Sequence, residues 1–200
     1  MKARNISLRF TFAILVAALA FPAISLAGQY HSNTQLPTGK QFIIKAAHVN
    51  LGEIALGKLA EKKATDPAIK DFGALMVTQH SALEQTLDTL AKDRGISLPT
   101  KPSAKQVALN DKLAKLSGQR FDNMYIQHML SGHRAAIAAF ENEIENGKNP
   151  SYKTYAAQGL PVIQDHIRIA ENIAGKMGRS GQYGLYQPSS AIHAGARAGN

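Results

Sequence analysis

The stretch FDNMYIQHMLSGHRAAIAAFENEI, residues 121–144, gives the strongest indication of the fold that we expect of this chain. Read at alternating steps of four and three, it places apolar side chains along one face of an α-helix, with one histidine at the centre of that face. The face consists of Ile126, Leu130, His133, Ile137, Phe140 and Ile144. A single histidine on an apolar face is more often a hydrogen-bonded core residue than a metal ligand, so His133 taken alone identifies no site.

The same spacing recurs in three other segments, which begin at Phe42, Ile69 and Tyr152. Each segment carries one polar residue near the middle of its apolar face. These polar residues are Glu53, His80 and His166. Because the midpoints of neighbouring helices lie at the same depth in an antiparallel bundle, we expect all three side chains to meet His133 in one layer of the core.

Capping signals indicate where the helices begin and end. Asp66 followed by Pro67 is typical of a helix start, and the pair Asn149-Pro150 repeats the signal. Gly95 and Gly147 mark helix ends. The predicted long helices therefore cover about 41–63, 67–94, 119–147 and 150–178. Pro161 lies inside the last of them, where we expect a kink.

The segment 95–118 separates the second long helix from the third. Pro99 and Pro102 interrupt it, and Ser103 with Gln106 forms a capping box for a short helix. The segment is long enough to run the length of a bundle. Two helix pairs joined by one long crossover is the topology of ferritin-like proteins, so we expect an all-α, antiparallel four-helix ferritin-like bundle.

The two ends of the chain differ from this central domain, which we place at 41–178. Residues 1–27 combine a basic start, a short apolar run and a small-residue cleavage site at Ala27, as in a secretory signal peptide. The alternative is an uncleaved N-terminal anchor. Residues 28–40 are predicted to be a disordered leader and 179–200 a disordered tail. We therefore expect a periplasmic or secreted protein, cleaved near Ala27.

Composition limits the possible functions. The chain has no cysteine, which excludes disulfides, thiolate metal ligands and haem attachment through C-x-x-C-H. Its formal net charge is +9, and removal of residues 1–27, which hold three basic residues and no acidic one, leaves +6. This positive excess suits loose contact with an anionic envelope surface. No nucleic-acid-binding motif is present, and no nucleophile elbow, H-E-x-x-H or phosphate-binding loop indicates an enzyme. We accordingly expect no catalytic residues, and the sequence identifies no partner.

Several segments resemble the bacterial family DUF4142, a domain of unknown function. The resemblance rests on GEIALGKLA around Glu53, FGALMVTQH ending at His80, FDNMYIQHMLSGH ending at His133 and LPVIQDH ending at His166. It covers roughly residues 41–177. The family is placed in the ferritin-like superfamily and is often labelled as predicted outer-membrane proteins. The resemblance implies that fold but no activity, because the family has none established.

The central layer has two interpretations. Three imidazoles and one carboxylate, from Glu53, His80, His133 and His166, form a complete set of ligands for one copper, zinc, iron or manganese ion. The alternative is a hydrogen-bonded polar layer without metal, in an envelope-associated structural or interaction module. A ferritin-type di-iron site is not indicated, since it needs a glutamate three residues before each of two ligand histidines.

Other polar or sulfur-bearing residues lie close to this layer in the sequence. Met76 and Met129 each precede a layer histidine by four residues, and a thioether favours copper(I), although methionine is also a common core residue. His48, His128 and Glu84 are expected at the periphery of the layer or hydrogen-bonded to its ligands. The glutamates at 141, 143 and 145 are expected to form a solvent-exposed face.

Overall fold

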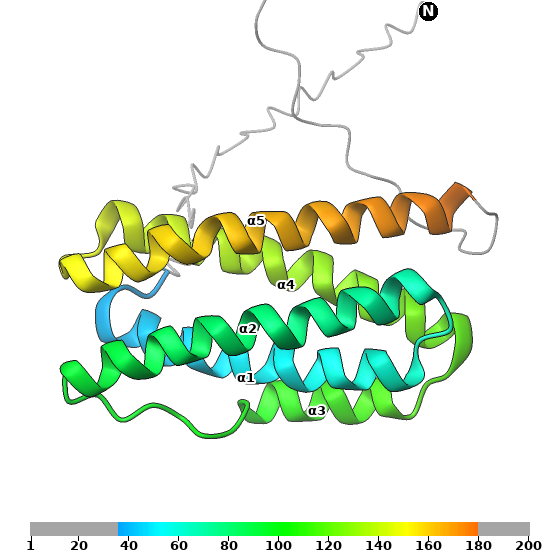
Figure 1. Ribbon diagram of the computed structural model, residues 1–200, viewed down its shortest axis with the longest axis horizontal. Helices are drawn as coiled ribbons and strands as arrows, with labels where there is room; N and C mark the ends of the chain where they lie inside the picture. Colours follow the sequence, from blue (N-terminus) through cyan, green and yellow to red (C-terminus); the bar gives the residue numbers. More distant parts are fainter. Residues whose placement is uncertain (1–35, 180–200) are drawn as a thin grey trace, which may run out of the picture. The chain divides into compact units, whose positions relative to one another are not determined.

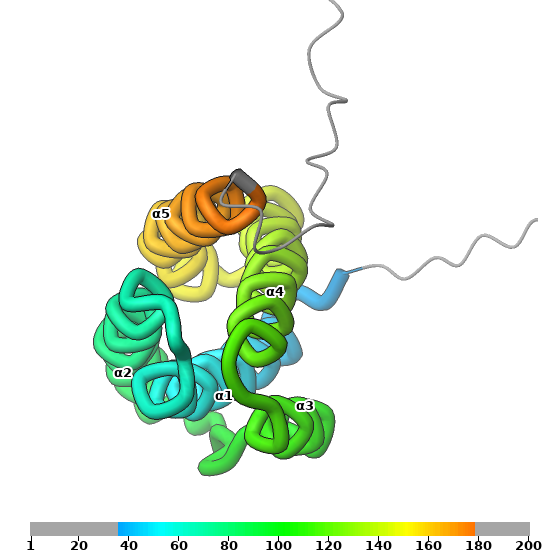
Figure 2. The backbone as a smooth tube through the Cα atoms, turned by 90° about the vertical axis from the view of Figure 1, so that its right-hand side faces the viewer, coloured from blue at the N-terminus to red at the C-terminus, as the bar shows by residue number. Residues whose placement is uncertain are grey.

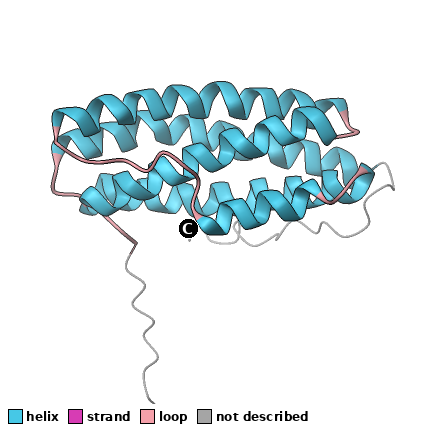
Figure 3. Cartoon of the chain, turned by 90° about the horizontal axis from the view of Figure 1, so that it is seen from below, coloured by secondary structure: helices cyan, strands magenta, loops and turns pink. Residues whose placement is uncertain are grey.

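A computed structural model describes residues 36–179, and all the regular structure in that range is helical (Figure 3). The helices are α1 (Gly39–Lys63), α2 (Pro67–Asp93), α3 (Ala104–Ala114), α4 (Gly118–Asn146) and α5 (Pro150–Arg179). The predicted signal peptide, most of the predicted leader and all but the first residue of the predicted tail lie outside the described residues. That first residue, Arg179, is the last residue of α5. The protein is thus all-α over the range in which it is described, as the sequence predicts.

Local sequence signals account for the ends of the helices. Asp66 caps α2 by accepting a hydrogen bond from the backbone N–H of Ala68 at 2.8 Å. Asn149 caps α5 in the same way, and Ser103 forms the predicted capping box of α3. Gly95 follows α2 with φ +62, a left-handed conformation that glycine adopts without steric cost. α1 begins at Gly39, slightly earlier than residue 41, and α5 continues as a helix through Pro161.

The four long helices lie side by side (Figure 1). α1 packs chiefly against α2, and α4 chiefly against α5, while α2 also contacts α5 and α1 contacts α4. Seen along their axes, α2, α5, α4 and α1 follow one another around a common interior (Figure 2). The short helix α3 lies outside this interior, against α1 and α4. The apolar faces of all four long helices can therefore be buried together.

The close packing of α1 on α2 depends on two glycines. A Cβ atom at Gly57 would lie 2.6 Å from the carbonyl oxygen of Gly73, and one at Gly73 would lie 2.8 Å from the carbonyl oxygen of Gly57. Both distances are shorter than any normal contact of a Cβ atom with the backbone. The two helix backbones approach this closely only because neither residue has a side chain.

Two acidic residues of α4 cap other helices from a distance. Asp122, fully buried, accepts hydrogen bonds from the backbone N–H groups of Thr65 and Asp66, at 3.1 Å each, and so holds the start of α2. Glu143 accepts from the backbone N–H of Gly39 at 2.6 Å and holds the start of α1. The expectation that Glu143 is solvent-exposed is wrong, because the side chain is completely buried at this cap.

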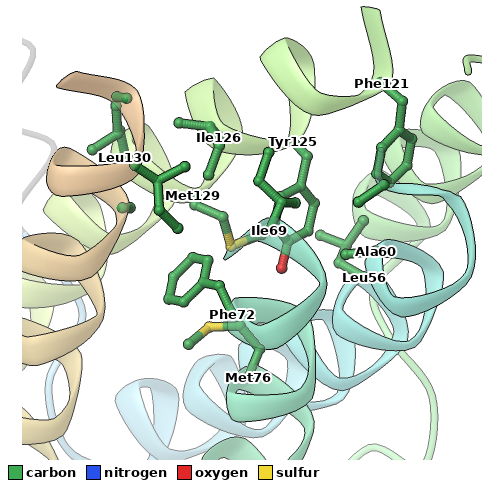
Figure 4. Packing of buried hydrophobic residues seen from close by; sticks show 14 of the residues in the cluster. Leu56, Ala60, Ile69, Phe72, Met76, Phe121, Tyr125, Ile126, Met129 and Leu130 are labelled. Carbon is green, nitrogen blue, oxygen red and sulfur yellow. The ribbon is translucent and has the colours of Figure 1, made fainter. Parts of the chain in front are cut away.

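The core consists of two apolar clusters, and Figure 4 shows part of the larger one. The larger cluster includes Leu56 of α1, Met76 of α2, Leu130 of α4 and Ala170 of α5. The smaller one surrounds Phe42 and Phe140. On each long helix, the predicted polar residue falls in the sequence between members of the two clusters. The polar layer is therefore enclosed by apolar packing on both sides. Among residues 36–179, no helix is long and apolar enough to cross a membrane.

Candidate metal centre

All four residues of the predicted layer are buried. The exposed fractions are 5% for Glu53, 2% for His80, 2% for His133 and 0% for His166. Each residue occupies the apolar face of a different long helix, so the helical spacing placed them correctly in the interior. A buried polar group without a partner costs roughly 1–3 kcal/mol, and the partners of these four side chains therefore decide what the layer can do.

The structure brings the three histidines together. One ring nitrogen from each of His80, His133 and His166 lies within 4.8 Å of the corresponding atoms of the other two. The ring centroids are 5.9 Å apart for His80 and His133, and 5.2 Å apart for each of the pairs that include His166. We call these three residues the histidine cluster. Its nitrogens are spaced closely enough to surround one metal ion.

The orientation of His80 is fixed by a chain of hydrogen bonds that ends at a carboxylate. Its Nδ1 lies 3.1 Å from Oδ1 of Asn50, and the amide nitrogen of Asn50 donates to Oε2 of Glu84 at 2.9 Å and to the Tyr155 hydroxyl at 3.3 Å. Since the amide oxygen can only accept, Nδ1 of His80 carries the proton. Nε2 of the same ring is buried without a hydrogen-bond partner among the described residues.

His133 and His166 are oriented by similar contacts. Nδ1 of His133 donates to the backbone carbonyl of Met129 at 2.8 Å, which leaves Nε2 of the ring without a proton in the neutral form. Nε2 of His166 contacts the side-chain oxygen of Gln79, and its Nδ1 faces Nε2 of His133 at 3.2 Å. Each ring therefore has one nitrogen on an oxygen acceptor outside the cluster. This pattern is typical of histidines that bind a metal through the other nitrogen.

The 3.2 Å separation of the His133 and His166 nitrogens has two chemical explanations. Two nitrogens that bind one ion tetrahedrally at about 2.0–2.1 Å are about 3.3 Å apart, close to the observed value. A proton shared between the two rings would give a similar distance. With Gln79 accepting from His166, however, both facing nitrogens bear lone pairs, and such an arrangement is stabilised by a cation. A shared proton would require Gln79 to turn its amide group.

Burial keeps two of the rings neutral. It lowers the pKa of His80 from 6.5 to about 4, although the charge of Glu53 partly opposes the shift. Burial also lowers the pKa of His166 to about 2, with a further contribution from the neighbouring rings of His80 and His133. A metal ion requires imidazole in its neutral form. These two rings are thus ready to bind an ion well below neutral pH.

Glu53, the fourth predicted ligand, lies outside the histidine cluster. Its Oε1 is 3.8 Å from Nε2 of His128, a ring whose side chain is 25% exposed. Its Oε2 is buried and has no hydrogen-bond partner within the range 36–179. Burial alone would raise the pKa of this carboxyl. The contact with His128 and the attraction of His133 and His80 outweigh that effect and lower the pKa to about 2. The layer therefore contains a buried carboxylate that retains a free acceptor atom.

The remaining sequence candidates fall outside the cluster. Met76 and Met129 are fully buried in the larger apolar cluster, which also contains Phe72 (Figure 4). His48 is hydrogen-bonded through Nδ1 to the backbone carbonyl of Lys101 at 3.1 Å. Glu84 reaches His80 through Asn50.

Sequence reasoning missed Asn50 and Gln79, which orient two of the three rings. Asn50 lies three residues before Glu53 in α1, one turn away and facing the same interior, so its position contained a usable signal. Gln79 directly precedes His80 and lies off the apolar face of α2, and it reaches His166 only because α5 packs there. No pattern along the chain indicates the contact between Gln79 and His166.

Comparison with known proteins agrees with this fold. The profile of the family described as "Domain of unknown function (DUF4142)" matches residues 26–173. A crystal structure of a DUF305 fragment from Deinococcus radiodurans is similar at 13% identity and a TM-score of 0.61, covering 70% of this chain and 99% of that chain. A DUF305 protein from Streptomyces coelicolor is similar at 12% identity and a TM-score of 0.58, covering 70% of this chain and 94% of that chain. At such identities the likeness extends to the fold alone.

Proposed function

We propose that this protein, which belongs to the DUF4142 family, binds one transition-metal ion through His80, His133 and His166, with Glu53 beside them. One observation carries the proposal: three buried imidazoles converge, and each has its other nitrogen hydrogen-bonded to an oxygen acceptor. Neutral imidazole is a common ligand of zinc, copper, iron and nickel. When bound, the ion would supply a Lewis-acidic centre.

Glu53 would contribute negative charge to this centre. Three neutral imidazoles leave the full charge of a divalent ion in a buried space, and a carboxylate of lowered pKa offsets part of it. In our proposal Glu53 is the fourth ligand or the nearest counter-charge. Removal of this carboxylate should weaken metal binding less than removal of a ring from the histidine cluster.

The proposal includes the architecture and the location of the protein. We infer an antiparallel four-helix ferritin-like bundle, with α3 lying in the long crossover between α2 and α4. The contacts of α1 with α2 and of α4 with α5 support this topology, as does the likeness to the DUF305 structures. We also infer that residues 1–27 direct the chain to the periplasm or outside the cell, because their pattern is that of a signal peptide.

The direct test is a titration of chelator-treated protein with copper, zinc, iron and manganese in separate experiments. Metal that binds the folded state preferentially should raise the unfolding midpoint. Calorimetry at room temperature should give one ion per chain. His133→Ala and His166→Ala should each remove most of the binding, whereas His48→Ala, outside the cluster, should preserve it. If none of the four ions binds, the layer is a hydrogen-bonded core without metal.

A second variant tests the role of Gln79. In Gln79→Glu the new carboxylate can only accept, so it holds the proton of His166 on Nε2 and leaves Nδ1 free for metal. Partners of this kind typically change metal affinity by about 10–100-fold, and we expect tighter binding in this variant. Gln85→Glu adds the same charge at an exposed position of α2 and should leave the affinity nearly unchanged. Equal affinities of the two variants would contradict the proposed orientation of His166.

A further inference from the structure

A cavity of about 720 Å³ opens beside the polar layer and reaches the protein surface. α1, α3 and α4 supply most of its wall, while α2 and α5 contribute His80 and Ile163 at the inner side. Its volume falls within the range of small-molecule sites, about 300–1,000 Å³. The exposed side chains of Lys45 and Lys105 are among the residues around it. An organic molecule can thus enter from solvent.

The wall of this cavity is largely apolar. Its lining residues include Phe42 and Ala46 of α1 and Ala136, Ala139 and Phe140 of α4. The aromatic rings of Phe42 and Phe140 contact each other edge to face, with centroids 5.0 Å apart, and form one continuous part of this wall. Such a surface gains free energy when it contacts an apolar molecule instead of water.

The charges around the cavity are arranged asymmetrically. The exposed lysines Lys45 and Lys105 belong to α1 and α3, and neither forms an ion pair with another residue of the range 36–179. Among the described residues that line the cavity, the acidic one is Glu53, which is buried and faces His128. The exposed lysines therefore favour an anionic group near the surface, and the apolar wall favours an apolar group.

We propose that this cavity binds an aliphatic carboxylate, with its alkyl chain against the apolar wall that includes Phe42, Ala136 and Phe140, and its carboxylate at Lys45 and Lys105. The opposite orientation would put the carboxylate beside the buried anion of Glu53 and leave the chain in water. A cationic amphiphile is disfavoured, because its positive charge would be repelled by the two lysines at the entrance. The proposal does not depend on a metal ion, because the cavity wall and the lysines exist without one.

Calorimetric titration of the chelator-treated full chain with hexanoate, octanoate and decanoate, each below its micelle concentration, tests the inference. The dissociation constant should fall about fourfold per added methylene, the factor expected for burying one methylene group. Ala136→Phe, which narrows the cavity, should weaken decanoate binding more than hexanoate binding. An affinity independent of chain length, or no binding of decanoate, would overturn the proposal.

Lysine variants test the orientation of the ligand. Replacing Lys45 and Lys105 together by glutamine should weaken decanoate binding about fivefold at low salt, as expected for two exposed ion pairs. The matched variant replaces Lys58 and Lys70, which are exposed but lie away from the cavity, and should bind as the wild type does. Equal losses in the two variants would contradict a carboxylate at the entrance. All of these titrations use metal-free protein, so their results do not depend on whether the proposed metal site exists.

Discussion

Replacement of His166 by phenylalanine should change how the stability of the metal-free protein depends on pH. The His166 side chain is fully buried, and burial lowers its pKa to about 2, against about 6.5 in the unfolded chain. Between these values the unfolded state binds a proton that the folded state does not bind. The free energy of unfolding must therefore fall as the pH falls below about 6.5.

The size of this effect follows from the two pKa values. Each pH unit below the unfolded value costs about 1.4 kcal/mol per histidine, so His166 lowers the free energy of unfolding by about 2 kcal/mol between pH 7.5 and 5. His80, with a pKa of about 4, should lower it by a similar amount. His166→Phe should remove about half of this combined loss.

Glu84 acts in the opposite direction. Burial raises its pKa from 4.5 to about 7, although the hydrogen bond from Asn50 partly opposes the shift. The folded state thus binds the extra proton between those values, and Glu84 should add roughly 2 kcal/mol to the stability as the pH falls from about 7.5 to 5. In Glu84→Gln, the free energy of unfolding should therefore decrease more steeply with falling pH than in the wild type.

Urea denaturation followed by circular dichroism, on chelator-treated protein at several pH values from about 7.5 to 5, gives the required free energies. The His166→Phe curve should be flatter than that of the wild type, and the Glu84→Gln curve steeper. If His166→Phe retains the wild-type pH dependence, the ring does not lie neutral in the core, and the metal proposal loses its basis.

Two further predictions concern the packing and capping of the helices. Gly57→Ala should destabilise the fold by about 2 kcal/mol, although alanine has the better helix propensity, because the new Cβ would clash with the Gly73 carbonyl oxygen. Gly132→Ala is the matched control, since its Cβ would make ordinary contacts. Thermal unfolding should show a small increase in the stability of this control. Asp122→Ala should lower the free energy of unfolding by about 3 kcal/mol, because the backbone N–H groups of Thr65 and Asp66 lose their acceptor. Asp122→Asn should lower it less. Equal stability of Asp122→Ala and the wild type in urea denaturation would refute this capping role.

The helices and their inward-facing residues could be predicted from the sequence. Periodicity and capping are local, because a helix repeats every 3.6 residues and its first turn is capped by a nearby side chain. For this reason Asp66, Ser103 and Asn149 could be identified as caps directly from the chain. The same periodicity identified His133 and His166 as buried residues on different helices.

Which of these polar residues contact one another depends on how the helices pack. The four polar residues lie at the same depth along the bundle, and this predicts that Glu53 joins the three histidines. Their depth does not fix the rotation of each helix or the direction of each side chain. In the folded chain Glu53 turns to His128, while Asn50 and Gln79 supply the contacts that orient His80 and His166. Glu143 is buried for a related reason, since its partner is the backbone of Gly39, far away in the sequence. Such contacts depend on how whole helices pack, and no local pattern encodes them.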